Sequence, residues 1–434
     1  MKQRNAYRVV RNLGLVYSIG VLLMVTGCTA LKDELNKGLR RHLDPAFRGE
    51  IKKVLKVLRG RLDPTKLDTG LPVITINTHE GRPVTSKAVY MDADLEIRDL
   101  QRDTYNLKTP VQIRGRGNTT WNALKKPYRL KFPKKTALFG YEKAKNWVLL
   151  ANYQDTTLLL NSIAFELGRR FGFPFTPHYT HVEVVLNGRY EGSYVLTEQV
   201  SVGPGRVAID EDGGFLVELD THYDEEPKFR TPRLDLPVMI KHPEEGGADA
   251  VKKALFDLEE ALLAPIFPDT LYQDIIDLDN FIDYIMINEI TRNIDLQLLH
   301  SVFLYRDQDS KICLGPLWDF DYGFDYSDGK YFVNAEGMYC NTSFREGPGQ
   351  WLLSRFFEDP VFRKAYQDRW NTIYPDLADM EVFIDTMAAS LEKSYQANAK
   401  VWWWNKVDYP KEIARLKEWW RNRIAYLQRE INSF

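Results

Sequence analysis

The spacing of apolar and polar residues changes along the chain, first near residue 72 and again near residue 245. From 72 to 200, runs such as "LPVITINTHEG" and "RYEGSYVLTEQV" alternate between apolar and polar residues, which predicts strands. One segment, "DTTLLLNSIAFELGRRFG", repeats at helical spacing instead, with Asp155 as its expected N-cap and Gly172 as its expected C-cap. From about 245 onward helical spacing dominates, for example in "LDNFIDYIMINEITRNI". The pattern predicts a β-rich region at 72–200 with one helix, followed by a mainly helical region at 201–434.

Two shorter patterns refine this prediction. The pair Asn187-Gly188 lies between two strand-like runs, and this pair favours a type I′ turn, so a hairpin is expected there. Within the helical region, "SVFLYRD" and "KICLGPLW" have the composition of strands. The chain shows no internal repeat and no low-complexity segment.

The first 27 residues have the composition of an export signal. Basic residues precede the apolar run "LGLVYSIGVLLMVTG", which is followed by Cys28. The run is shorter than the roughly 20 residues that a membrane-spanning helix needs, although an uncleaved anchor remains the alternative. The tetrapeptide "VTGC" resembles a bacterial lipobox. This resemblance implies that Cys28 carries a lipid and that the protein is anchored in the bacterial cell envelope, outside the cytoplasm.

Residues 28–71 are highly charged and have apolar positions at three- and four-residue intervals, as in "EIKKVLKVLRGRL". This pattern predicts a helical tether between the lipid anchor and the folded body. The tether is expected to pack on that body, and contact with a membrane surface is the alternative.

Composition narrows the classes of function. The chain has 434 residues, of which 44% are hydrophobic and 27% charged, as expected for a folded globular protein with a large core. Its net charge of −2 argues against a nucleic-acid partner, because such proteins usually carry an excess of basic residues. After Cys28 only Cys313 and Cys340 remain, so no disulfide framework is predicted, although one bridge stays open.

The segment "VQIRGRGNTTWNALKKPYRLKF", residues 111–132, contains the first candidate site. Glycines such as Gly117 let a ligand approach the backbone, and Arg114 and Arg116 favour an anion such as phosphate. In the strand that follows, Arg129 and Lys131 share one face, from which Lys131 can reach phosphates held by the loop. An ordinary hairpin with solvated arginines is the alternative interpretation.

Two glutamates are weaker candidates for the same site. Glu166 lies in the middle of the predicted helix, where it either pairs with Lys131 or is solvated. Glu198 lies where the strand-rich region ends, a place suited to a hinge that contacts an adenine base, although a polar strand end is an equally common explanation.

The second candidate site consists of carboxylates from two stretches. Asp295 follows a helical pattern and is expected in a loop, and Asp319 and Asp321 lie in "GPLWDFDYGFDY", residues 315–326. One carboxylate can accept a hydroxyl proton while the other holds Mg²⁺, and the alternating rings are expected to place the acids in an apolar setting. The alternative is a turn of buried rings and exposed acids. Along the chain the candidate motifs occur in the order found in protein kinases: a glycine loop, a strand lysine, a helix glutamate, a hinge, a loop aspartate and an Asp-Phe motif.

The chain also resembles the CotH kinase family, which are secreted or spore-coat-associated atypical protein kinases. The resemblance rests on "IRGRGNTTW", "KKPYRLKF", "NWVLLANYQDTTLLLNSIAFELGRRFG", "YEGSYVLTEQV", "GGFLVELD" and "GPLWDFDYGF", within residues 72–330. It implies an α+β, two-lobed, atypical protein-kinase-like fold, with ATP bound by the loop Arg116, Gly117 and Asn118 and by Lys131. Asp295 would be the catalytic aspartate and Asp319 the Mg²⁺ ligand, supported by Asp321.

These expectations lead to a hypothesis and one alternative. The hypothesis is an atypical kinase that transfers the γ-phosphoryl group of ATP to Ser or Thr of exported or surface proteins, itself included. In kinases an asparagine five residues after the catalytic aspartate binds the second metal, and here that position is His300, a poor ligand for Mg²⁺. The alternative is therefore a catalytically silent surface lipoprotein that binds a protein or glycan through aromatic segments such as "VWWWNKV" and "KEWW".

Overall fold

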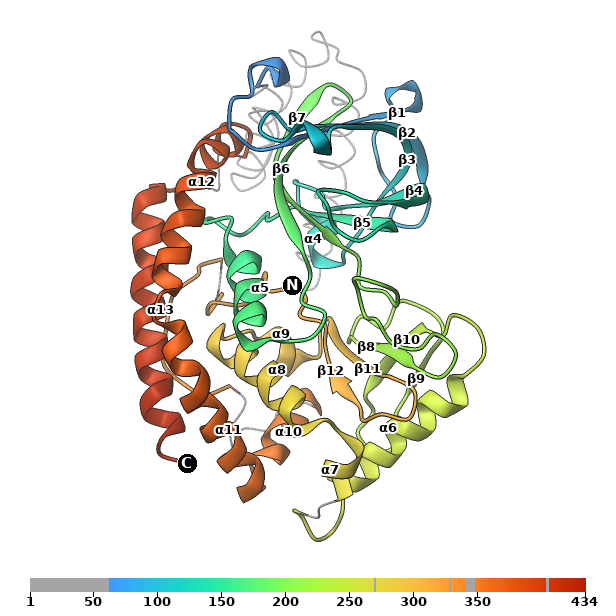
Figure 1. Ribbon diagram of the computed structural model, residues 1–434, viewed down its shortest axis with the longest axis vertical. Coiled ribbons are helices and arrows are strands. Elements are labelled where there is room, and N and C mark those ends of the chain that lie inside the picture. The colour runs from blue at the N-terminus through green and yellow to red at the C-terminus, as the bar shows by residue number, and fades with distance from the viewer. Residues whose placement is uncertain (1–61, 269–270, 328, 340–347, 403–405) are drawn as a thin grey trace, which may run out of the picture.

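The computed structural model describes residues 62–268, 271–327, 329–339, 348–402 and 406–434 (Figure 1). Its strands are β1 (Val73–Thr78), β2 (Met91–Arg98), β3 (Leu107–Gly115), β4 (Tyr128–Thr136), β5 (Ala144–Leu150), β6 (Tyr179–Leu186), β7 (Arg189–Glu198), β8 (Phe215–Leu219), β9 (Lys228–Arg230), β10 (Pro237–His242), β11 (Val302–Arg306) and β12 (Cys313–Leu314). Its α-helices are α4 (Thr119–Asn122), α5 (Leu160–Phe171), α6 (Ala248–Leu262), α7 (Leu271–Ile275), α8 (Leu278–Ile290), α9 (Asp295–Leu298), α10 (Pro348–Phe356), α11 (Pro360–Ile373), α12 (Met380–Val401) and α13 (Tyr409–Ile431). Four 3₁₀ turns are η1 (Pro64–Lys66), η2 (His79–Gly81), η3 (Asp103–Tyr105) and η4 (Tyr374–Leu377).

The β-rich region is a closed barrel with the strand order β1-β2-β3-β4-β5-β7-β6. Neighbouring strands run antiparallel except β1 and β6, which pair in parallel and close the cylinder. Alternate residues point inward, and the barrel core includes Ile74, Leu95 and Trp147, each at most 2% exposed. The predicted β-rich region and its helix α5 are confirmed, while the short helix α4 and the closure of the sheet are additional findings.

A second sheet, in the order β12-β11-β8-β10-β9, lies below the barrel in Figure 1. The sequence pattern predicted β11 and β12, but β8, β9 and β10 were missed, so the expectation of a mainly helical region from residue 201 was incomplete. These three strands have five, three and six residues. Runs of this length do not repeat often enough to distinguish strand from helix by periodicity.

Helices form the rest of the C-terminal region. Figure 1 shows α12 and α13 side by side along one edge of the molecule, where α12 also contacts β7 of the barrel. The largest apolar cluster joins the two long helices to α5, α8 and α11, with Trp370 and Leu416 fully buried. A smaller cluster of Val148, Leu216, Phe303 and Trp318 joins the barrel wall to the second sheet, and this junction is called the seam below.

Local sequence explains two boundaries that the pattern predicted. Helix α5 ends at Gly172, whose φ of +65° is the left-handed conformation that glycine adopts without cost. The expectation of Asp155 as the N-cap was wrong, because α5 begins at Leu160 with Leu159 as its N-cap. The carboxylate of Asp155 instead accepts hydrogen bonds from the amides of Thr157, Leu158 and Leu160, and so fixes the turn that leads into the helix. Asn187 and Gly188 both have positive φ in the turn between β6 and β7, as a type I′ hairpin requires.

Most of the predicted signal segment and tether, together with Cys28, lies outside the described residues. The described end of the tether, residues 62–71, holds only the turn η1, and Leu62 and Leu67 pack against a cluster that includes Val73 and Trp402. Within the described part of the chain, none of the helices combines the length and hydropathy needed to cross a bilayer.

Candidate functional site

The glycine loop after β3 needs glycine at two positions. A Cβ at Gly115 would lie 2.2 Å from the ring of Trp121, so a larger residue would displace the ring. Gly117 has a φ of +79°, and a Cβ there would lie 2.3 Å from the nearest side-chain atom. Lys87 fixes the end of the loop, because its Nζ donates a hydrogen bond of 2.7 Å to Oδ1 of Asn118. The loop backbone is therefore tightly held, with the ring of Trp121 packed against Gly115 and the side chain of Thr120 packed against Gly117.

Replacing Gly117 with alanine is expected to lower the free energy of unfolding by about 1–3 kcal/mol, because alanine is strained at positive φ. It is also expected to weaken ATP binding, since the new methyl group displaces the loop. Gly188→Ala is the matched control: its φ is +70°, yet a Cβ there meets nothing within 4 Å. Chemical denaturation and ATP titration of both variants measure the two effects. Equal ATP affinity in Gly117→Ala and the wild type would exclude the loop from the binding site.

Arg116 connects the glycine loop to the acidic stretch. Its guanidinium lies over the ring of Trp318, 5.5 Å from the ring centre. Burial lowers the pKa of Arg116, and the nearby charges of Asp319 and Asp321 oppose that shift. An arginine remains charged in this setting, so it partly neutralises both carboxylates. The structure thus brings together three residues that the sequence placed in two separate motifs.

The acidic loop at 319–321 is fixed by the helix α5. Asn161 donates a hydrogen bond of 2.9 Å from Nδ2 to Oδ1 of Asp321, and its Oδ1 accepts one of 3.1 Å from the amide of Phe320. Phe320 is 1% exposed, and Trp318 is also buried. Burial, followed by the charge of Asp319, raises the pKa of Asp321 to about 7, and burial also raises the pKa of Asp319. The rings do place the acids in an apolar setting, where two like charges are costly unless a cation is near.

Asp295 begins the short helix α9 and is 4% exposed. Its amide donates a hydrogen bond of 3.3 Å to Oδ1 of Asn293, whose Nδ2 in turn donates one of 3.4 Å to the carbonyl of Asp319. Burial, with the charge of Asp319 adding to it, raises the pKa of Asp295 to about 6. Asn293 therefore contacts the backbone of both Asp295 and Asp319, so Asp295, which begins a short helix rather than lying in the predicted loop, adjoins the acidic loop.

A second connection joins the same two loops. Arg292 forms an ion pair of 2.8 Å with Oδ1 of Asp325, and both side chains are about nine-tenths buried. Oδ2 of Asp325 accepts a hydrogen bond of 2.5 Å from the amide of Asn334. Arg292, Asp319 and Asp325 all have φ between +50° and +58°, a conformation that is strained in residues other than glycine. The loops are thus fixed by buried charges in a geometry that the backbone alone would not favour.

Three further polar residues lie near Asp295, of which the sequence had pointed to His300 but not to His222 or Asp220. Nδ1 of His300 lies 3.2 Å from Oδ1 of Asp295, and Nδ1 of His222 lies 2.7 Å from Oδ1 of Asp220. The two imidazole rings are 5.1 Å apart. The hydrogen bond to Asp295 is the main reason that the pKa of His300 is raised. In the sequence, His300 occupies the position of a metal-binding asparagine. In the structure it contacts Asp295, the candidate catalytic aspartate. Asp220 lies in "GGFLVELD", and sequence analysis assigned it no role of its own. Only the structure places it near His300 and Asp295, and so within the candidate site.

Lys131 and Glu166 lie apart from each other. Lys131 is on the outer face of the barrel, exposed, with its Nζ 5.5 Å from the ring centre of Tyr90, and Arg114 lies over the same ring at 5.0 Å. The carboxylate of Glu166 instead forms an ion pair of 2.9 Å with Arg170, one turn further along α5. Of the two interpretations left open for Glu166, the pair with Lys131 is not formed.

Glu198 is buried at the end of β7, as expected for a residue between the barrel and the second sheet. Its Oε2 accepts a hydrogen bond of 2.7 Å from the amide of His178, and its Oε1 lies 3.1 Å from Nδ1 of the same residue. These contacts fix the start of β6 to the end of β7. The described contacts of Glu198 are thus structural.

The aromatic segments of the alternative hypothesis are largely internal. Trp419 and Trp420 are each 3% exposed, and Trp402 is 2% exposed with its Nε1 donating a hydrogen bond to the carbonyl of Glu191. Trp403 and Trp404 lie outside the described residues. The described tryptophans therefore belong to the core rather than to a binding surface.

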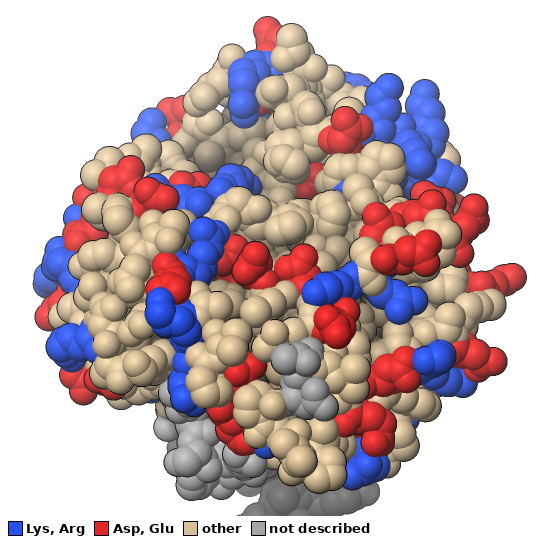
Figure 2. All heavy atoms as spheres, turned by 60° about the horizontal axis from the view of Figure 1, so that its bottom comes forward, with Lys and Arg blue, Asp and Glu red and all other residues tan. Residues whose placement is uncertain are grey.

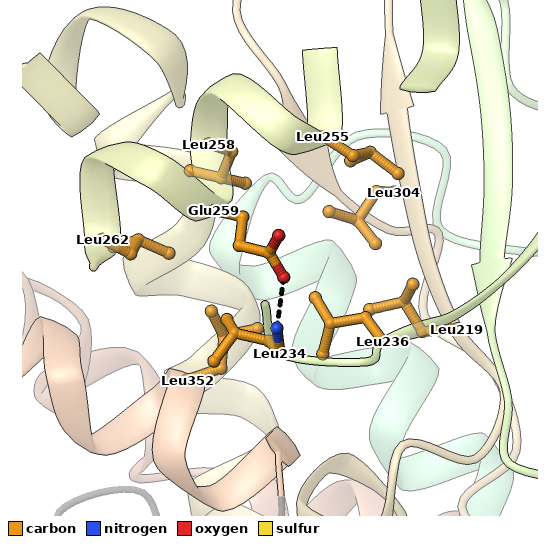
Figure 3. A pocket seen from close by; sticks show the side chains of 9 residues that line it. All are labelled: Leu219, Leu234, Leu236, Leu255, Leu258, Glu259, Leu262, Leu304 and Leu352. Carbon is orange, nitrogen blue, oxygen red and sulfur yellow. Dashed lines mark hydrogen bonds between the residues drawn. The ribbon is translucent and has the colours of Figure 1, made fainter. Parts of the chain in front are cut away.

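A small cavity lies in the core away from the two candidate motifs. This cavity of about 20 Å³ between α6 and the second sheet is lined by leucines and by Glu259, whose carboxylate accepts a hydrogen bond from the amide of Leu234 (Figure 3). It has room for no more than about one water and lies in the core. Among the described residues, no cluster of three or more His, Cys, Asp and Glu side chains has the arrangement of a metal site. On the face seen in Figure 2, basic and acidic side chains are interspersed.

The fold and the site define an α+β protein in which an arginine-bearing glycine loop lies near the carboxylates of Asp319 and Asp321, with Asp295 at the start of α9 next to them. A family model described as "CotH kinase protein" matches residues 113–427. Because this match covers most of the chain, the protein belongs to the CotH kinase family. The match includes the helical tail as well as both candidate motifs, and it confirms the resemblance found in the sequence. Among curated proteins, no match is found.

Proposed function

We propose that this protein is an atypical protein kinase that transfers the γ-phosphoryl group of ATP to Ser or Thr hydroxyl groups of exported or surface proteins, possible self-modification included. The observation that carries the proposal is the contact of Asn293 with both Asp295 and Asp319, opposite Arg116. Family membership supports the class of reaction. The envelope location and the lipid on Cys28 are part of the proposal and rest on the first 28 residues of the sequence.

The residues fit an ATP–Mg²⁺ complex. Mg²⁺ is usually held by one or two carboxylates, with phosphate and water oxygens as the other ligands, so Asp319 and Asp321 suffice as the protein ligands. The raised pKa of both acids indicates that their charges lack enough compensation from Arg116 alone. Bound Mg²⁺ would supply positive charge to the phosphates and to these acids. The ring of Trp121 and the side chain of Thr120 fill the space beside Gly115 and Gly117, so the contribution of the loop to phosphate binding is the side chain of Arg116, held next to the acidic loop.

Three side chains would carry out the remaining parts of phosphate transfer. Arg116 compensates negative charge on the phosphates next to the acidic loop. Asp295 accepts a hydrogen bond from the acceptor hydroxyl and takes its proton as the oxygen attacks phosphorus. His300 orients the carboxylate of Asp295 through the contact at 3.2 Å.

The proposal is tested with the purified full-length chain, Mg²⁺ and ATP labelled in its γ-phosphate. We expect incorporation of label into the chain or into a generic protein substrate, and loss of incorporation in Asp319→Asn. Asp309→Asn is the control, because Asp309 is an exposed residue of the β11–β12 turn with positive φ, which asparagine tolerates. If the wild type incorporates no more label than Asp319→Asn, the proposed activity is wrong.

A further inference from the structure

Three arginines lie along the outer wall of the barrel next to the seam. Arg114 on β3 pairs directly with Arg129 on β4, and Arg116 follows two residues after Arg114. The residues that alternate with them, Ile113 and Leu130, are fully buried in the barrel core, so the arginine side chains project outward. Next to Arg129 on the neighbouring strand is Val148, which belongs to the seam. The arginine row therefore runs along the junction that also holds Asp319.

Two of these arginines have unused hydrogen-bonding capacity. The Nε atoms of Arg114 and Arg129 are both buried, and neither has a hydrogen-bond partner in the described part of the chain. Burial lowers the pKa of Arg129, and the nearby charge of Arg114 acts in the same direction. Buried donors of a charged group are costly when unpaired, so this pair has the features of a binding site for an anion. Guanidinium groups match phosphate in particular, because they donate parallel hydrogen bonds to two oxygens.

An acidic residue currently lies near this pair. Glu225, in the loop between β8 and β9, forms an ion pair of 2.5 Å with Lys241 on β10, and Lys241 also pairs with Glu218 on β8 at 2.6 Å. Burial alone would raise the pKa of Glu225, but Lys241, Arg129 and Arg114 together hold it below its ordinary value. The carboxylate of Glu225 is 60% exposed, whereas that of Glu218 is 12% exposed. The carboxylate of Glu225 is thus attracted by the two arginines but is not fixed by burial. If Glu225 moved, Lys241 would still be paired with Glu218.

We propose that Arg114 and Arg129 form a two-strand clamp for the phosphates of the nucleotide, and that the nearby charge of Glu225, held by Lys241, opposes phosphate binding there. The proposal rests on the proposed kinase function and names residues of that site. It assigns to Arg129 the role that the sequence suggested for Lys131, two residues further along the same strand. Arg129 lies at the seam with Arg116, whereas Lys131 is exposed beside Tyr90.

The first test compares cations of strand β4 by calorimetric titration of the full-length chain with Mg²⁺–ATP. Arg129→Ala removes charge-assisted hydrogen bonds, so affinity is expected to fall by about tenfold or more. Lys131→Ala is expected to weaken binding less than Arg129→Ala does. Lys134→Ala, an exposed change on the same strand, controls for loss of general positive charge. Arg129→Lys keeps the charge without the planar donor fork, and we expect intermediate affinity. Thermal unfolding of each variant establishes that it is folded.

Two probes then locate the interaction on the nucleotide. Inorganic triphosphate should lose affinity in Arg129→Ala as ATP does, whereas adenosine should bind the variant and the wild type alike. Equal ATP affinity in Arg129→Ala and the wild type, or an equal loss for adenosine, would overturn the clamp.

In the second test the substitution is expected to raise the affinity for ATP rather than lower it. Glu225→Gln removes a negative charge near the clamp, so ATP is expected to bind more tightly, by a few-fold up to about tenfold. Glu226→Gln is the matched control on the same loop, because Glu226 is 71% exposed and pairs with Lys228 instead. Weaker or unchanged ATP binding in Glu225→Gln would overturn this opposing effect of Glu225.

The outcomes separate this inference from the proposed function. ATP binding that does not depend on Arg129, together with phosphate transfer, would overturn the clamp and leave the kinase. ATP binding that depends on Arg129 without phosphate transfer would support the clamp and overturn the kinase. Absence of ATP binding in the wild type would overturn both.

Discussion

Replacing Arg423 with methionine is expected to lower the free energy of unfolding by about 3–5 kcal/mol, because it leaves a buried carboxylate without its counter-charge. Arg423 on α13 and Glu289 on α8 are both 0% exposed and form an ion pair. The guanidinium also donates hydrogen bonds to the carbonyls of Ala335 and Gly337, at 3.0 and 2.7 Å. One side chain therefore joins the last helix, the helix before Asp295 and the segment after the acidic loop.

Urea denaturation measures this loss, with Arg421→Met as the matched control. Arg421 lies on the same helix and pairs with Glu381, but its side chain is 57% exposed, so its loss should cost less than about 1 kcal/mol. Adding Glu289→Gln to Arg423→Met should recover part of the stability, because it removes the buried charge. Equal stability losses in Arg423→Met and Arg421→Met would show that the buried pair contributes no more than a surface pair.

Replacing Asp295 with asparagine is expected to reduce the rate of phosphate transfer by about 10²–10⁴-fold while leaving ATP binding intact. Asparagine preserves the shape of the side chain but cannot take the proton of the acceptor hydroxyl. Single-turnover transfer and ATP titration, measured on the same samples, separate the two effects. Transfer at the wild-type rate would exclude Asp295 as the proton acceptor.

The pH dependence of the wild type provides a second measure of Asp295. Its pKa is raised to about 6, and only the ionised form accepts a proton, so the rate should rise with pH through about 6 and then level off. The hydrogen bond from His300 favours the ionised form. His300→Gln should therefore move the rise toward higher pH, and an unmoved profile would exclude this role for His300.

The sequence predicted the parts of the site that depend on local chemistry. The glycine loop, the acidic stretch around Asp319 and the loop aspartate Asp295 were each identified from residue types and spacing. Their order along the chain indicated the class of protein. The C-terminal end of α5 at Gly172 and the hairpin at Asn187-Gly188 were also predicted, because caps and turns are determined by neighbouring residues. The start of α5 was predicted at Asp155 and lies at Leu160 instead.

What the sequence could not predict depends on contacts between distant segments. Barrel closure pairs Val73 with Glu183, 110 positions apart, and nothing in either strand indicates its partner. Period-two spacing placed Arg129 and Lys131 on the same face, but only the packing of β8 against the barrel shows which of them reaches the seam. The sequence left Glu166 either paired with Lys131 or solvated, whereas the structure pairs it with Arg170, one helical turn away.

Barrel closure also affects how copies of this protein can meet. A closed cylinder leaves no row of unpaired amides and carbonyls, so the β-rich region offers no strand edge to a neighbouring molecule. The second sheet does have edges, but β12 has two residues and β9 has three, with Lys228 and Arg230 as charged flanks. Short, charged edges resist edge-to-edge pairing. Copies of this protein at high local concentration would therefore be protected against aggregation through the sheets of the described residues.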